Sequence, residues 1–242
     1  MDYKLIALDI DGTLTNSRKE ITPRTRYALL EAQAQGKKLI IASGRHPLGV
    51  YPIAQDLQLD RYGGYIMSFN GGKIIECATD RTIVTKLFPR EYLPDIMSVL
   101  KDSNITVITW DDKRIYANSK VNDYTYVEEE VLKIEMVVVE DFLSSIKFDI
   151  NKILLAGEPD ELDEYQKLLE KRYDGLLEKL GVTRDELIAF GDNYNDMTMI
   201  GYAGMGVAMG NGEAEIKKIA NYVCPSNDED GIAETLQKYV LK

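Results

Sequence analysis

Short, continuous runs of apolar residues that stop at Asp, Ser or Gly constrain the fold of this chain more than any other feature. The clearest runs are Leu5–Leu8, Leu39–Ala42, Ile66–Phe69 and Leu187–Phe190, and a weaker run covers Gly206–Met209. Continuous rather than alternating apolarity indicates strands that are buried on both faces, as in a parallel sheet. The sequence therefore predicts a sheet that is covered on both sides.

Amphipathic segments separate these runs. Residues Arg24–Gln35 are predicted to form a helix, with Thr22 as its N-cap, Pro23 in its first turn and Gly36 after its end. Further helices are predicted at Glu213–Ala220 and Ile232–Leu241. Strands that alternate with helices predict an α/β fold with a doubly wound, Rossmann-like parallel sheet.

The middle of the chain has a different pattern. Its β-prone segments are Ile83–Phe88, Ile105–Trp110, Arg114–Ala117, Met136–Val139 and Lys152–Ala156, and helical patterns occur at Glu91–Lys101 and Asp160–Arg172. This is an α+β pattern between two α/β halves. We predict a core domain formed by residues 1–81 and 176–242, with an inserted α/β cap domain at residues 82–175.

The charge of the 242-residue chain narrows its partners. With 40 acidic and 29 basic residues, the formal net charge is −11. Such a chain repels phosphate backbones and anionic lipid, so we expect no nucleic acid and no membrane as partner. A small phosphorylated molecule can still bind where a metal ion supplies positive charge. The apolar runs are far shorter than the roughly 20 residues that cross a bilayer, and the first residues lack a signal-peptide pattern, so we expect a cytoplasmic protein.

Two acidic loops follow predicted strands. Asp9-Ile10-Asp11-Gly12-Thr13 follows the first strand, and Gly191-Asp192-Asn193-Tyr194-Asn195-Asp196 follows the strand at Leu187–Phe190. In an open α/β sheet, ligands bind beyond the carboxyl ends of the strands. Carboxylates gathered there repel one another unless a cation or a shared proton intervenes, and Mg²⁺ prefers carboxylates, water and phosphate as ligands. The alternatives are a plain Asp-Gly turn in the first loop and an Asx-rich helix cap in the second.

A third loop, Ser43-Gly44-Arg45, follows the run Leu39–Ala42. A Ser hydroxyl and a Gly N–H at a strand end can donate to phosphate oxygens, although Ser-Gly is also common in ordinary loops. Gly12 permits a tight turn that directs N–H groups toward an anion. His46 is the only histidine, and we interpret it as a residue of the surface loop; the alternative is a contact with substrate, since it lies two residues after Gly44.

Together these motifs resemble those of the haloacid dehalogenase superfamily, in its Cof-type phosphatase branch with a subclass IIB cap. The segment Asp9–Thr13 matches the first motif, Ser43 the second, and residues 191–196 the fourth. Asn70-Gly71-Gly72 resembles a segment that ends a later core strand in this branch. The predicted inserted domain resembles the α/β cap of the branch.

The resemblance implies a role for each matching residue. Asp9 would be the nucleophile, and Asp11 would act as general acid and then as general base. The residues that would hold Mg²⁺ are Asp9, Asp11 (through its carbonyl), Asp192 and, as an orienting neighbour, Asp196. The residues that would bind the phosphate group are Gly12, Ser43, Gly44 and Asn195. Two residues could contact the rest of the substrate, Arg45 and Asn70.

The chain departs from the family pattern at the third motif, a Lys in a Gly-rich stretch ahead of the fourth motif. Residues 173–186 contain no such stretch, and Lys179 lies too near the end of the predicted helix Leu176–Leu180 to match. This helix is also too short to span a sheet. Either a segment is missing from the printed sequence or the chain carries a true internal deletion. A deletion would leave core surface bare, at about 25 cal/mol per Å², which favours the missing segment.

The motifs predict a Mg²⁺-dependent phosphatase, a phosphoric monoester hydrolase. Its substrates would be small phosphorylated metabolites, sugar phosphates first among them, hydrolysed through an aspartyl-phosphate. A phosphotransferase or phosphomutase of the same superfamily is the nearest alternative. A phosphate-binding or regulatory protein with little turnover is a further alternative if the third-motif lysine is truly absent, since loss of one such cation costs about 10²–10³ in rate.

Overall fold

The computed structural model describes residues 3–162, 164–165 and 187–241. The chain divides into two compact units, Met1–Val84 with Leu180–Lys242, and Thr85–Lys179. The division into segments 1–81, 82–175 and 176–242 stays a prediction, because its second boundary lies outside the described residues.

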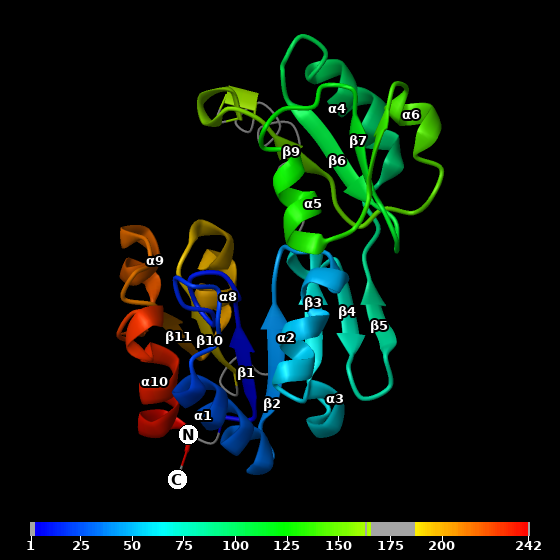
Figure 1. Cartoon of the computed structure of the whole chain (residues 1–242). Coiled ribbons are helices and arrows are strands. Elements are labelled where there is room, and N and C mark those ends of the chain that lie inside the picture. The colour runs from blue at the N-terminus through cyan, green and yellow to red at the C-terminus, as the bar shows by residue number, and fades with distance from the viewer. Residues whose placement is uncertain (1–2, 163, 166–186, 242) are drawn as a thin grey trace. The chain divides into compact units, whose positions relative to one another are not determined.

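The first unit is built on one sheet, whose strand order is β12-β11-β10-β1-β2-β3-β4-β5 (Figure 1). Its strands are β1 (Leu5–Leu8), β2 (Lys38–Ala42), β3 (Tyr65–Ser68), β4 (Lys73–Glu76), β5 (Arg81–Thr85), β10 (Leu187–Gly191), β11 (Met205–Ala208) and β12 (Tyr222–Val223). Neighbouring strands from β12 to β3 are parallel, and β4 is antiparallel to β3. The predicted parallel α/β core is confirmed, and the five predicted core strands begin and end within one residue of those observed.

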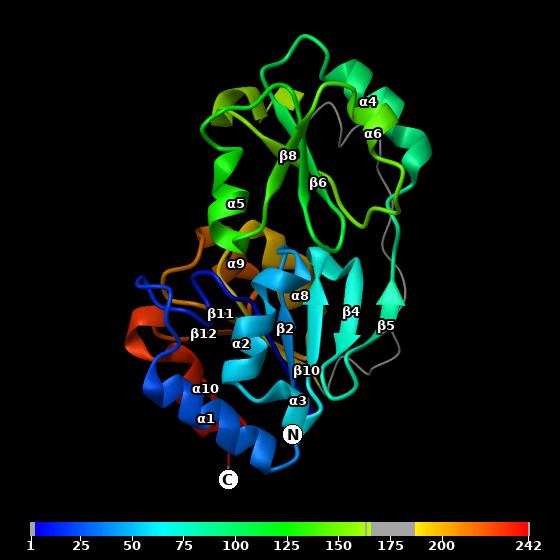
Figure 2. The ribbon, with the colours of Figure 1, turned by 45° about the vertical axis from the view of Figure 1, so that its right-hand side comes forward.

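Helices flank this sheet. They are α1 (Pro23–Ala34), α2 (Tyr51–Asp56), α3 (Leu59–Tyr62), α8 (Met197–Tyr202), α9 (Ala214–Ile219) and α10 (Gly231–Tyr239). The helices α1 and α10 lie side by side (Figures 1 and 2). Their buried faces carry Ala28, Leu29 and Ala32 from α1 and Ile232 and Leu236 from α10, which join the hydrophobic core under the sheet. Among the described residues, no helix has both the length and the apolar character needed to cross a bilayer.

The strand register fixes where the motif loops meet. Leu8 of β1 is paired with Phe190 of β10 on one side and with Ile41 of β2 on the other. The loops that follow these strands therefore leave the same edge of the sheet. The strand order also reverses at β1, and such a switch point is where open α/β sheets bind ligands.

The second unit contains a sheet of its own, in the order β8-β7-β6-β9. Its strands are β6 (Thr106–Trp110), β7 (Ile115–Asn118), β8 (Met136–Val139) and β9 (Leu154–Ala156), and its helices include α4 (Leu93–Val99), α5 (Tyr126–Leu132) and α6 (Phe142–Ser145). The helices α4 and α6 lie side by side (Figure 2) and share one core with β6, in which Ile96, Val107 and Phe142 are buried.

The strand predicted at Ile83–Phe88 is only partly correct. Residues 83–85 belong to β5, which lies at the edge of the first sheet and not in the inserted one, and residues 86–88 are not in a strand. The reason is that Arg81–Thr85 continues the chain from β4 through a short turn. Most of the helix predicted at Asp160–Arg172, and all of Leu176–Leu180, lies outside the described residues.

Replacing Thr22 by Ala should lower the free energy of unfolding by about 1–2 kcal/mol. The Thr22 side chain caps α1 by accepting from the Thr25 N–H at 3.2 Å, and it also donates to the Asp230 carboxylate just before α10. Urea unfolding measures the change. Thr22→Ser keeps the hydroxyl and should stay close to wild type, whereas equal loss in both variants would contradict a capping role.

Candidate active site

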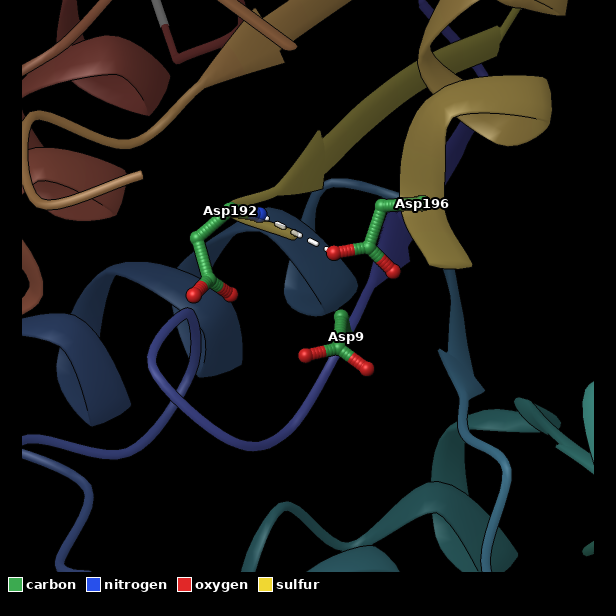
Figure 3. Close-up of side chains that lie close together, drawn as sticks. All are labelled: Asp9, Asp192 and Asp196. Carbon is green, nitrogen blue, oxygen red and sulfur yellow. Dashed lines mark hydrogen bonds between the residues drawn. The ribbon is translucent and has the colours of Figure 1, made fainter. Parts of the chain in front are cut away.

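Three carboxylates converge at the carboxyl ends of β1 and β10 (Figure 3). Asp9 directly follows β1, Asp192 directly follows β10, and Asp196 ends the short 3-10 turn Tyr194–Asp196 before α8. One oxygen of each lies within 4.8 Å of the others. Asp9 and Asp196 are buried and Asp192 is half-buried, so little water reaches the charges.

Burial, with repulsion from nearby carboxylates, raises the pKa of all three groups. The pKa of Asp9 rises to about 8, because of burial first and then of repulsion from Asp196 and Asp192. Burial also raises the pKa of Asp192 and that of Asp196. At neutral pH Asp9 therefore keeps its proton unless a cation joins the cluster. An all-carboxylate donor set of this kind fits Mg²⁺, a hard cation that prefers oxygen ligands.

Backbone and hydroxyl donors hold the carboxylates in place. Asp196 Oδ2 accepts from the N–H groups of Asp192, at 3.0 Å, and of Asn193, at 3.1 Å. Thr13 Oγ1 donates to Asp192 Oδ1 at 2.8 Å. Asn193 and Asp196 also form a capping box at the turn before α8. The second acidic loop is therefore both an Asx-type cap and part of the carboxylate cluster.

Two glycines let the acidic loops approach this closely. Gly12 has a φ of +77°, and a Cβ built there would lie 2.5 Å from Asp192 Oδ2. A Cβ on Gly191 would lie 2.5 Å from the Asp196 Cβ. A side chain at either position would displace a carboxylate of the cluster, so packing favours glycine at both positions, and the positive φ also favours glycine at Gly12.

The carboxylate of Asp11 lies outside this cluster and is held by two cations. Two guanidinium nitrogens of Arg45 donate to it. Nη2 donates to Oδ2 at 2.6 Å and to Oδ1 at 2.8 Å, and Nε donates to Oδ2 at 3.0 Å. Lys19 Nζ donates to it at 2.9 Å. Burial works to raise the pKa of Asp11, but Lys19 and Arg45 outweigh it and lower the pKa. Asp11 is therefore ionised in this state of the protein.

Lys19 and Thr13 also contribute to the site, although no role was predicted for either from the sequence. Lys19 has a φ of +62° in a turn held by Asn16, whose carbonyl accepts from the Lys19 N–H at 2.9 Å. No motif includes this lysine. Its exposed side chain contacts Asp11 because the turn brings the two residues together. Thr13 could have been noticed as the hydroxyl nearest to the Asp-Gly turn.

The residues that were predicted to bind the phosphate group or the rest of the substrate lie on different loops and differ in burial. Ser43 is buried at the end of β2, and its Oγ accepts from the Arg45 N–H at 3.2 Å. Gly44 follows it and is half-buried. Asn195 is exposed, and its amide donates to Asp196 Oδ1 at 2.8 Å. Asn70 is exposed after β3, in the short turn Phe69–Gly71.

The interpretation of His46 as a surface residue is wrong. Only 4% of His46 is exposed, and its Nδ1 accepts from the Leu48 N–H at 3.1 Å, at the start of the 3-10 turn Pro47–Gly49. Its ring lies against Phe69, which comes from a separate strand end. Lys179, the weak match to the third motif, lies outside the described residues.

The family model of the haloacid dehalogenase-like hydrolases matches residues 6–176 and 171–236 of the chain. The chain belongs to this family. The two matched stretches meet at residues 171–176, the part of the chain in which the third motif is expected. The resemblance to Cof-type members of the superfamily is confirmed.

Relatives of this hydrolase match it along its whole length. A haloacid dehalogenase-like hydrolase of known structure from Bacteroides thetaiotaomicron is 35% identical, with a TM-score of 0.84 over 98% of this chain and 99% of that chain. A phosphoglycolate phosphatase from Methanobrevibacter smithii is 30% identical over 246 residues, 100% of both chains. A 5-amino-6-(5-phospho-D-ribitylamino)uracil phosphatase from Bacillus subtilis is 27% identical over 248 residues, 100% of this chain and 97% of the relative. The hydrolase is accordingly a phosphatase, a phosphoric monoester hydrolase.

In the metal-free protein, stability should fall as the pH rises from about 4 to about 8, the window between the ordinary and the raised pKa of Asp9. Within it, Asp9 keeps its proton when folded and loses it when unfolded, so unfolding releases a proton and rising pH favours unfolding. This one group contributes a slope of at most about 1.4 kcal/mol per pH unit.

Thermal unfolding in a chelating buffer checks this slope. Asp9→Asn carries no such proton, so the variant should gain stability relative to wild type as the pH rises. The same comparison isolates Asp9 from other titrating groups. A difference between the two proteins that stays constant across the window would contradict the raised pKa.

Proposed function

We propose that this hydrolase is a Mg²⁺-dependent phosphatase that removes phosphate from small phosphorylated metabolites through an aspartyl-phosphate on Asp9. The observation that carries the proposal is the position of Asp9. It is buried at the end of β1, between the acidic loop after β10 and the Ser43 loop after β2. Asp9 therefore lies between carboxylates that can bind a metal ion and loop groups that can bind a phosphate.

The fit of the donor set supports Mg²⁺ as the cofactor. Asp9, Asp192 and the carbonyl of Asp11 would hold the ion, with Asp196 orienting the Asp192 loop through its two backbone hydrogen bonds. When bound, the ion would neutralise charge between the Asp9 carboxylate and the phosphate group.

In the first step, an Asp9 oxygen attacks phosphorus and the bond to the leaving oxygen breaks. Asp11 gives a proton to the leaving alkoxide. Asp11 is held ionised by Arg45 and Lys19 in the substrate-free protein. A phosphate dianion competes for these two cations, so its arrival would raise the pKa of Asp11 and let it take up the proton that it donates.

In the second step, water attacks the phosphorus of the aspartyl-phosphate and the bond to Asp9 breaks. Asp11, now ionised, accepts the proton of the water molecule. Ser43, Gly44 and Gly12 are the residues that we assign to the phosphate oxygens in both steps. The Asn195 amide donates one hydrogen bond to Asp196 and would use its second N–H for a phosphate oxygen.

The substrate class rests on charge and on the relatives. The net charge of −11 disfavours nucleic acid. The relatives named above are phosphatases of phosphoglycolate and of a phosphorylated ribityl compound, both small phosphate esters. We propose sugar phosphates as the first substrates to test. We assign contacts with the rest of the substrate to Arg45, in the loop after β2, and to Asn70, in the turn after β3.

Asp9→Asn should abolish Mg²⁺-dependent hydrolysis of an aryl phosphate, because the amide cannot form the covalent intermediate. Release of inorganic phosphate measures the activity, and the Thr22→Ser variant serves as an active control. Full activity in Asp9→Asn would refute the mechanism. Phosphate that appears on an added sugar and not in water would instead identify a phosphotransferase.

Asp11→Asn should affect poor leaving groups far more than good ones. A sugar phosphate leaves as a basic alkoxide and needs the proton of Asp11, so its kcat should fall by about 10²–10⁴. An aryl phosphate leaves as a weakly basic phenoxide and should lose much less in its first step. Equal losses on both substrates, measured by single-turnover kinetics, would contradict the role of Asp11 as the acid.

A further inference from the structure

Three consecutive residues after β3 adopt left-handed backbone conformations. Their φ values are +54° at Phe69, +54° at Asn70 and +87° at Gly71. Glycine adopts this region without strain and Asn tolerates it, whereas a bulky residue such as Phe does not. Strain of this kind persists where the surrounding contacts over-determine the backbone, and it is concentrated at functional sites.

The strained turn is fastened to the Ser43 loop. The Phe69 N–H donates to the Arg45 carbonyl at 3.2 Å, and the Asn70 N–H donates to the Ser43 carbonyl at 3.1 Å. The Ser43 N–H in turn donates to the Met67 carbonyl at 2.9 Å. The N–H groups of Phe69 and Asn70 thus hold the backbone of the loop at both of its ends, Arg45 and Ser43.

An aromatic pair locks the same two segments together. The rings of Phe69 and His46 meet edge to face, with centroids 5.3 Å apart and planes at 84°. Phe69 is 8% exposed and His46 is 4% exposed. Such pairs are favourable beyond the area they bury, and burial restricts the rings to one arrangement. His46 also joins the loop to the turn Pro47–Gly49, since its carbonyl accepts from the Gly49 N–H at 2.9 Å.

We propose that Phe69 and His46 are positioning residues, which hold the Ser43–Arg45 loop in the geometry that receives the phosphate group. The assignment rests on the proposed phosphatase function. Neither ring belongs to the Asp9, Asp192 and Asp196 cluster, so the pair acts on the phosphate side of the site and leaves the metal side unchanged.

Two variants break the ring pair and leave the backbone hydrogen bonds of the two segments available. Phe69→Leu retains an apolar side chain with the same strained backbone and loses the ring edge. His46→Asn loses the ring but keeps a side-chain oxygen that can accept from the Leu48 N–H. Each should lower kcat/KM for an aryl phosphate about tenfold, because small displacements of binding groups are costly. The Mg²⁺ activation constant should stay at the wild-type value in both variants. The control variant Phe69→Tyr keeps the ring and should have wild-type activity.

The double variant tests whether the two residues act through each other. If the ring pair is what positions the loop, Phe69→Leu combined with His46→Asn should be no worse than either single variant. Multiplied losses would mean that the residues act separately and would overturn the proposal.

A second readout keeps the test independent of turnover. Inorganic phosphate, added with Mg²⁺, should raise the melting temperature of the wild type more than that of either single variant. Wild-type binding of phosphate without hydrolysis would refute the proposed function alone. Unchanged kcat/KM and phosphate shifts in both variants would overturn the positioning role alone. If the loss of kcat/KM is accompanied by a lower melting temperature without phosphate or by a changed Mg²⁺ activation constant, the role of the pair is merely structural. That outcome would also overturn the positioning role.

Discussion

Repulsion among Asp9, Asp192 and Asp196 is the constraint on which this end of the sheet depends. Three carboxylates with oxygens within 4.8 Å of one another, two of them buried, are unstable together as anions. The protein opposes the repulsion with fixed donors, namely two N–H groups on Asp196 and the Thr13 hydroxyl on Asp192. A backbone hydrogen bond from Ile10 works to lower the pKa of Asp9, but burial and repulsion outweigh it and raise this pKa to about 8. The residue that needs a cation most is therefore the one assigned as nucleophile.

Asp9 and Asp11 show how neighbouring carboxylates are given different chemistry. Asp9 lies among carboxylates and its pKa is raised, whereas Asp11 lies between Arg45 and Lys19 and its pKa is lowered. Pairs of titratable groups whose environments push their pKa values apart are typical of acid and base assignments. Here the separation arises within one loop, because Asp9 faces Asp192 and Asp196 whereas Asp11, two residues further on, binds Arg45 and Lys19.

The sequence predicted the core strands closely, because apolar runs buried on both faces end abruptly at Asp, Ser and Gly. It also predicted that Asp9, Asp192 and Asp196 gather, since parallel strands place their following loops at one edge. It could not predict Lys19 beside Asp11, because that contact depends on a left-handed turn eight residues further on. The burial of His46 was missed for a related reason: its partner Phe69 comes from another strand, and ring contacts leave no periodic pattern.

The distribution of charge implies an order of events at the site. A phosphate monoester brings roughly two negative charges to a cluster of carboxylates, and such an approach is unfavourable until positive charge is present. Arg45 and Lys19 are already engaged by Asp11, so they become available to the phosphate only as Asp11 takes up a proton. Mg²⁺, the proposed cofactor, would compete at the Asp9 cluster with a proton and not with a fixed ion pair, and its binding would release that proton from Asp9. Binding of the metal ion before the phosphate is therefore the order that the electrostatics favour.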